Sequence, residues 1–79
     1  MKKKDAFMKA YAYENRNLAP YQRRELAEDH IYRAIALLQD EIDMQNMYAS
    51  MDYGTLPTEH YKKAIVMLKN ALISLKKEW

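Results

Sequence analysis

Aromatic and basic side chains gather near the start of the chain, and they are the residues best suited to ligand chemistry. Residues 11–24 hold three Tyr and three Arg. A Tyr ring stacks on flat ligands such as nucleobases, and an Arg guanidinium forks onto phosphate or stacks as well. The alternative is that these amphipathic rings pack in a core or an interface. The candidate ligand-binding residues are Tyr11, Tyr13, Arg16, Arg23 and Arg24.

A second set of polar residues, all lysines, repeats near the end of the chain. Lys62, Lys69 and Lys76 recur at seven-residue intervals, and no acid lies between His60 and Lys77. Seven-residue spacing places side chains on one face of a helix. The pattern indicates an anion-binding face for phosphate groups or for an acidic protein surface. The alternative is a solvated face that pairs with acids of another helix.

Residue types that serve catalysis or metal binding are present, but not at useful spacings. Neither His30 nor His60 has a second His four residues away, and no Glu is followed by His at the third position. Helical zinc and di-iron motifs need those spacings. The chain has no Cys and no Gly-rich phosphate loop, and neither Ser50 nor Ser74 stands beside a His or Asp. We therefore expect no enzymatic activity, no bound metal and no cofactor.

Composition favours one small helical domain over residues 1–79. Apolar residues make up 49% and charged residues 30% of the 79, which is typical of globular chains, and one Gly with two Pro favours helix over sheet. The longest apolar runs, Ala34–Leu38 and Ala64–Leu68, are too short to cross a membrane. We expect a cytoplasmic protein with no membrane partner.

Charge alternates along the chain although the net charge is only +2. Residues 1–16 carry +3, residues 17–53 carry −4 and residues 54–79 carry +3. Such blocks fit helices that attract one another across an antiparallel contact. They fit nucleic-acid binding less well, because that function usually needs a basic surplus over the whole domain.

Capping and turn residues divide the chain into three expected helices. Asp5 is suited to cap the first helix, after a basic lead-in at Lys2–Lys4. Pro20 fits the first turn of a second helix, and Gly54 is able to take the left-handed conformation after its last turn. The predicted fold class is therefore all-α, with helices near residues 5–16, 20–51 and 58–78.

The two long helices carry matching apolar faces. On the second helix the face consists of Ile31, Ile35, Leu38, Ile42, Gln45 and Ala49. On the third it consists of Tyr61, Ile65, Leu68, Leu72, Leu75 and Trp79. One side chain per turn on each face predicts lengthwise packing, and the short connection makes the pair an antiparallel hairpin.

The second helix also carries another apolar row, roughly 110° around its axis from the first. One helix with two apolar faces needs two partners. The short first helix covers only about three turns, so we expect another subunit to bury the rest, in a helical-bundle homo-oligomer. The alternative is that these side chains stay half-exposed in a monomer. The candidate interface residues are Leu37, Met44, Met47, Tyr48 and Met51.

A short Tyr-bearing helix followed by a long helical hairpin resembles the phage proteins that sequester cyclic oligonucleotides and so counter CBASS-type bacterial defence. The matching stretch is Tyr11 or Tyr13, then residues 16–18 (Arg-Asn-Leu), then the hairpin. The resemblance implies that a Tyr of the first helix and a basic residue of the next bind the ligand, here Tyr11 and Arg24. It also implies a homo-oligomer with ligand pockets between subunits.

Three hypotheses about function follow from these observations. The first is a non-catalytic binding or inhibitor protein that acts on a protein partner through oligomeric interfaces, encoded by a phage or mobile element. The second is the sponge for cyclic oligonucleotide signals. The third is a nucleic-acid-binding accessory protein that uses Lys2–Lys4 and the lysine face, and its affinity would fall steeply with salt.

Overall fold

The computed structural model describes residues 2–77 and is all-helical over that range, as predicted. Its elements are α1 (Lys2–Glu14), α2 (Pro20–Ser50) and α3 (Glu59–Lys77). The expected bounds differ most at the first helix, which includes the lysines expected to precede it. Lys and Ala are strong helix formers, and Asp5 lies inside the first turn, where its charge complements the helix dipole. Trp79 lies outside the described residues.

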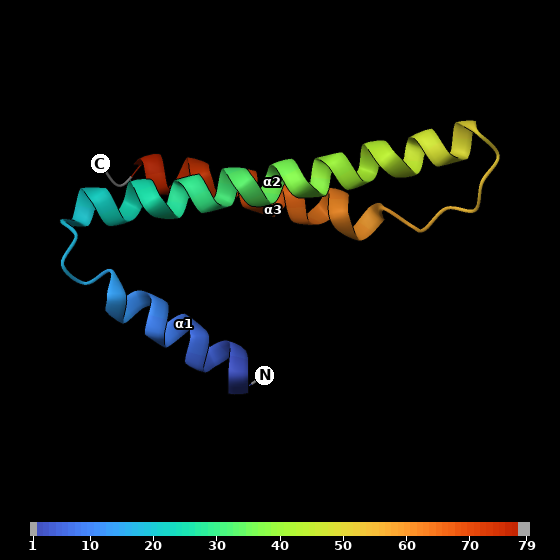
Figure 1. Ribbon diagram of the computed structural model, residues 1–79. Helices are drawn as coiled ribbons and strands as arrows, with labels where there is room; N and C mark the ends of the chain where they lie inside the picture. The colour runs from blue at the N-terminus through green and yellow to red at the C-terminus, as the bar shows by residue number, and fades with distance from the viewer. Residues whose placement is uncertain (1, 78–79) are drawn as a thin grey trace.

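Helices α2 and α3 pack against each other as an antiparallel hairpin (Figure 1). Its centre is formed by the predicted faces, because all four buried residues come from them: Ile42, Gln45, Ile65 and Leu72. Leu38 and Leu68 are half-buried beside them. Among the described residues, no side chain is completely shielded from solvent. The hairpin is therefore a single narrow seam rather than a thick core.

Helix α2 begins and ends in ways that the local sequence explains. Pro20 takes its first position, where a missing N–H has no cost, and the Gln22 side chain accepts a hydrogen bond of 2.9 Å from the Ala19 N–H. At the other end, the Tyr53 N–H donates to the Tyr48 carbonyl at 2.9 Å and the Asp52 N–H donates to the Ala49 carbonyl at 3.2 Å. These two bonds form a Schellman motif.

The left-handed residue of that motif is Asp52, with a φ of 62°, and not Gly54, whose φ is not positive. The expectation for Gly54 was therefore wrong. Asp tolerates the left-handed conformation better than most residues, so the left-handed position falls two residues before the glycine. The Tyr48 and Tyr53 rings meet edge to face with centroids 6.4 Å apart, which is the apolar contact that often accompanies this motif.

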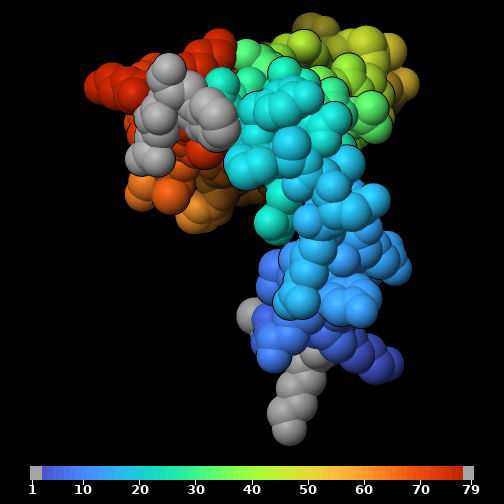
Figure 2. All heavy atoms as spheres, turned by 90° about the vertical axis from the view of Figure 1, so that its left-hand side faces the viewer, coloured from blue at the N-terminus to red at the C-terminus, as the bar shows by residue number. Residues whose placement is uncertain are grey.

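Helix α1 stands apart from the hairpin. In Figure 1 it diverges from α2 toward its N-terminus, and in the end-on view of Figure 2 it projects as a separate arm. Among the three helices described within residues 2–77, only α2 and α3 have Cα atoms within 8 Å of each other. The radius of gyration is 16.4 Å, whereas a compact chain of this length has about 12 Å. The single chain is elongated.

None of the three described helices is both long enough and apolar enough to cross a membrane.

Candidate functional site

The junction between α1 and α2 brings aromatic and polar groups together. The Asn15 side chain donates to the Tyr11 carbonyl at 2.8 Å, and the Asn15 N–H donates to the Ala12 carbonyl at 3.2 Å, so α1 ends in a hydrogen-bonded turn. The chain then reverses into α2, and the Tyr11 hydroxyl is hydrogen-bonded to His30 Nε2 at 2.5 Å. This bond links the arm to the hairpin.

The same junction contains a short aromatic ladder. The Tyr11 ring lies edge to face on the His30 ring, with centroids 5.6 Å apart. One turn earlier in α1, the Phe7 ring stacks on Tyr11 at 6.4 Å. Edge-to-face and offset-stacked pairs are favourable arrangements of rings. The ladder runs from the exposed half of α1 onto the surface of α2.

A cavity of about 190 Å³ lies beside this ladder, between α1 and the first turns of α2. It combines an aromatic ring, an amide, a guanidinium and apolar walls, which suits a small flat anion. Two of the five candidate ligand-binding residues, Tyr11 and Arg23, lie on it. The lining residues are Tyr11, Ala12, Asn15, Arg23, Leu26 and Ala27.

The other three candidates lie elsewhere. Arg16 stacks over the exposed Tyr13 ring, 5.0 Å from its centroid. Arg23 lies on the side of α2 that faces α1. Because consecutive helical residues are about 100° apart, Arg24 lies instead on the seam between α2 and α3. It pairs with Glu28 at 3.3 Å and donates to the Leu75 carbonyl at 3.3 Å. Arg24 thus ties the start of α2 to the end of α3 and does not meet Tyr11.

The predicted interface row is exposed in the single chain. Leu37 is 74% exposed, Met47 and Met51 are also exposed, and Met44 is half-buried. Tyr48 is half-buried by its contact with Tyr53. Leu37, Met44 and Met51, which we call the outer row, therefore form an apolar strip along α2, facing away from α3.

Sequence reasoning missed that His30 begins this strip. His30, Leu37, Met44 and Met51 recur every seven residues, so all four share one face of α2. The spacing was readable from the sequence, but a lone His offers no apolar side chain to reveal it. In the structure, Tyr11 of α1 contacts the His30 end of the strip, Leu37 and Met51 are exposed, and Met44 is half-buried.

The lysine face of α3 is solvated. Lys62 and Lys69 are exposed, and Lys76 donates to the Tyr32 hydroxyl at 3.4 Å. The expected alternative, pairing with acids of the long helix, is not seen among the described residues. The two ion pairs there, Arg24 with Glu28 and Arg33 with Asp29, both lie within α2. The lysines remain available to an external anion.

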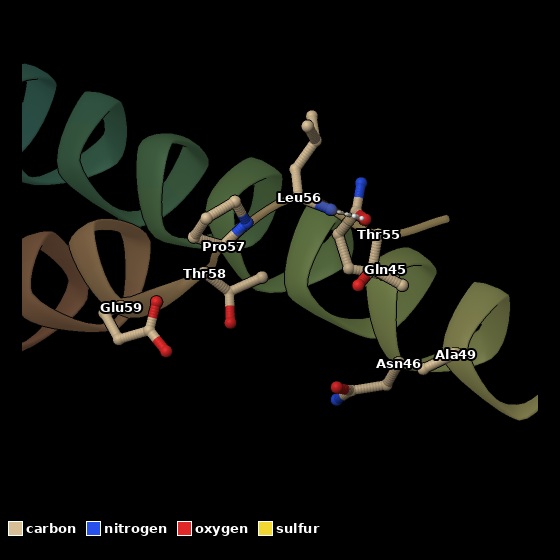
Figure 3. Close-up of a pocket in the computed structure, with 8 residues that line it drawn as sticks. All are labelled: Gln45, Asn46, Ala49, Thr55, Leu56, Pro57, Thr58 and Glu59. Carbon is tan, nitrogen blue, oxygen red and sulfur yellow. Dashed lines mark hydrogen bonds between the residues drawn. The ribbon is translucent and has the colours of Figure 1, made fainter. Parts of the chain in front are cut away.

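A larger cavity, of about 390 Å³, lies at the tip of the hairpin (Figure 3). Gln45 crosses it: its amide donates to Glu41 at 2.9 Å, and its carbonyl accepts from the Leu56 N–H at 2.8 Å. The carbonyl end of this buried side chain thus holds the connecting loop, while its amide end is bonded within α2. In the part of the chain that the structure describes, no three His, Asp or Glu side chains are grouped to hold a metal ion.

Comparison with known proteins found no family, no curated protein and no solved structure that matches this chain. The resemblance to the cyclic-oligonucleotide sponges therefore stays a prediction.

Proposed function

We propose that this protein is a non-catalytic binding protein that works as a homo-oligomer. The proposal rests on the surface that the single chain leaves exposed. A compact monomer of 9.4 kDa has about 5,000 Å² of accessible surface, whereas this chain has 6870 Å². The excess of about 1,900 Å² is within the range that one subunit buries in an obligate oligomer.

The character of the exposed surface supports the same proposal. Within residues 3–77 only four side chains are buried, and chains of this size seldom fold on so small a core unless something else stabilises them. Meanwhile large apolar side chains on all three helices are exposed, including Phe7, Leu37 and Ile73. Association with further copies would bury them and enlarge the core. The assembly would then present several copies of the lysine face to a partner.

The test is the mass of the native protein in solution. Light scattering and sedimentation should give a multiple of 9.4 kDa from low to high micromolar concentration. Native mass spectrometry of protein purified from its host would report the number of subunits and any retained ligand together. A 9.4 kDa particle at high concentration, with full helix content, would end the proposal.

A second candidate function is favoured by the cavity between α1 and α2, and it is the sponge for cyclic oligonucleotides. Tyr11 and Arg23 lie on that cavity with Asn15. Its volume of about 190 Å³ is smaller than the 300 Å³ or more of ordinary ligand sites. A nucleotide would therefore need walls from a second copy, so this candidate also depends on assembly.

Calorimetry with a panel of cyclic di- and trinucleotides tests the second candidate. Stacking on Tyr11 would contribute about 1–3 kcal/mol per base, so Tyr11→Ala should weaken binding by about fivefold to a hundredfold. Tyr13→Ala is the matched control, because Tyr13 does not line the cavity. An absence of heat with every member of the panel at physiological salt would remove this candidate and leave the first one standing.

A further inference from the structure

We infer that the outer row of α2 is covered by helix α1 of a second copy of this chain. The inference rests on the proposed homo-oligomer and says which surfaces meet in it. In a closed symmetric assembly, each copy would give one arm and receive another. Four observations on the chain carry the inference.

The first observation is that α1 already binds one end of this strip. Tyr11 is hydrogen-bonded to His30 and lies edge to face on its ring. His30 shares its face of α2 with Leu37, Met44 and Met51. Contact between an α1 aromatic and this face is therefore present within one chain. The rest of the face offers the same kind of site, with apolar side chains in place of the imidazole.

The second observation is that α1 has an apolar face of its own to bury. Phe7 and Met8 are 70% and 58% exposed, and they lie within about 100° of Tyr11 on the helix. The 13 residues of α1 span about 20 Å, and the strip from Leu37 to Met51 spans about 21 Å. The arm and the outer row therefore match in both length and polarity.

The third observation is charge. Between Leu37 and Met51 the chain holds three acids, Asp40, Glu41 and Asp43, and no basic residue. Helix α1 is basic, with Lys3 and Lys4 exposed on or beside its apolar face. An α1 helix on the outer row would place lysines beside those carboxylates. Pairing two outer rows with each other would instead bring carboxylates against carboxylates near the symmetry axis.

The fourth observation is that α1 has little support within its own chain beyond the contact of Tyr11 with His30. Isolated helices shorter than about 12–15 residues are marginal in water. No Cα atom of α1 comes within 8 Å of a Cα atom in the described parts of α2 or α3. Packing on a neighbouring copy would supply the tertiary contact that a 13-residue helix needs. The basic outer face of α3, with Val66 and Ile73, is the competing occupant, but α3 is already supported by the seam.

Mixed disulfide formation tests the contact directly, because the native chain has no Cys. Met8→Cys protein is mixed with Met44→Cys protein and gently oxidised, and the products are weighed by mass spectrometry. The expected product is a disulfide-linked dimer that contains one chain of each variant. Repeating the experiment with Leu37→Cys and Met51→Cys shows in which direction the arm runs. Asn70→Cys, on the exposed side of α3, measures random collision.

A pair of α1 variants keeps the test independent of cysteine chemistry. Phe7→Ser should lower the oligomer mass, whereas Tyr13→Ser, which is 67% exposed and lies about 120° away on α1, should leave it unchanged. If the protein is a monomer, both the proposed function and this inference fail. If it is an oligomer but mixed disulfides do not exceed the Asn70→Cys background at any row position, or if Phe7→Ser keeps the full mass, only the arm contact is wrong.

Discussion

Two faces of helix α2 differ sharply in solvent exposure. On the seam face of α2, Ile42 is 4% exposed, while five positions earlier Leu37 is 74% exposed. Both side chains are large and aliphatic, and both belong to seven-residue repeats. They differ in what lies opposite: α3 packs on the seam at Ile42, whereas neither α2 nor α3 covers Leu37. Whether a side chain on α2 is buried therefore depends on whether another helix packs against it, and not on its residue type.

The hairpin and the arm differ in the same way. Helix α3 buries its own Ile65 and Leu72 against α2, and Arg24 of α2 donates a hydrogen bond to the Leu75 carbonyl near the end of α3. Helix α1 is hydrogen-bonded to the hairpin through the Tyr11 side chain and leaves Phe7 and Met8 exposed. We therefore expect the hairpin to resist unfolding and the arm to depend on assembly. Matched substitutions on the two faces can separate these behaviours.

The largest contrast should come from one substitution made on both faces. Leu72→Asp puts an unpaired carboxylate into the seam, which costs about 3–5 kcal/mol, comparable with the whole stability of so small a domain. We expect it to unfold the chain, as seen by loss of helical circular dichroism. Leu37→Asp should change the intrinsic stability of the chain by no more than about 0.5 kcal/mol, because the site is exposed in the single chain.

Leu37→Asp is expected to act on assembly instead, by lowering the mass seen by light scattering. Equal melting temperatures for wild type and Leu72→Asp would show that the seam is not the stabilising contact. Unfolding of Leu37→Asp at concentrations where the wild type is folded would show that folding of the hairpin and assembly are coupled. The seam and the outer row would then not have separate roles.

Met44→Lys should weaken assembly without affecting the seam. Burying a Met side chain contributes about 1.5–3 kcal/mol, so losing it raises the dissociation constant by about tenfold to a hundredfold. Sedimentation over a range of concentrations would measure this change. Asn46→Lys is the control, because position 46 lies on nearly the opposite side of α2 and is exposed. Equal shifts in the two variants would mean that added charge, and not the outer row, weakens association.

Much of this fold was predictable from local patterns. Seven-residue repeats on the two long helices predicted the hairpin, and Pro20 marked the start of α2 within one residue. The end of α2 was harder, because its left-handed position is taken by Asp52 and depends on the Tyr48–Tyr53 contact. The conformational preference of glycine alone predicted the left-handed residue at Gly54, two positions after the residue that adopts it.

The candidate site was less predictable than the fold. Composition marked the Tyr and Arg cluster, but it does not tell which Arg shares a cavity with Tyr11. That depends on the turn at residues 15–19, which decides the side of α2 that meets the arm. In the structure it is Arg23, and Arg24 lies on the seam with Glu28. Because neighbouring residues of a helix are rotated by about 100°, Arg23 lines the cavity while Arg24 connects α2 to α3.

Gln45 is the polar exception on the seam, and replacing it should have a moderate effect. Gln45→Leu keeps the bulk but leaves the Leu56 N–H without its acceptor, which should lower the free energy of unfolding by about 1–2 kcal/mol. Denaturant unfolding would measure the loss. Gln39→Leu is the control, since Gln39 is exposed and bonds only to Asp43 on its own helix. A Gln45→Leu protein as stable as wild type would mean that water replaces the lost bond to the loop.

The smallest expected effect concerns the hydrogen bond between Tyr11 of the arm and His30 of the hairpin. Tyr11→Phe keeps the ring on His30 but removes the hydroxyl, which contributes about 0.5–1.5 kcal/mol. Because that bond is the arm's polar link to the hairpin, amide hydrogens of α1 should exchange up to about tenfold faster, while those of α2 and α3 stay unchanged. Tyr13→Phe is the control, since its ring contact with Arg16 survives the change. Faster exchange throughout the chain would show that arm and hairpin unfold together, whereas unchanged exchange in α1 would show that the ring, and not the hydroxyl, holds the arm in place.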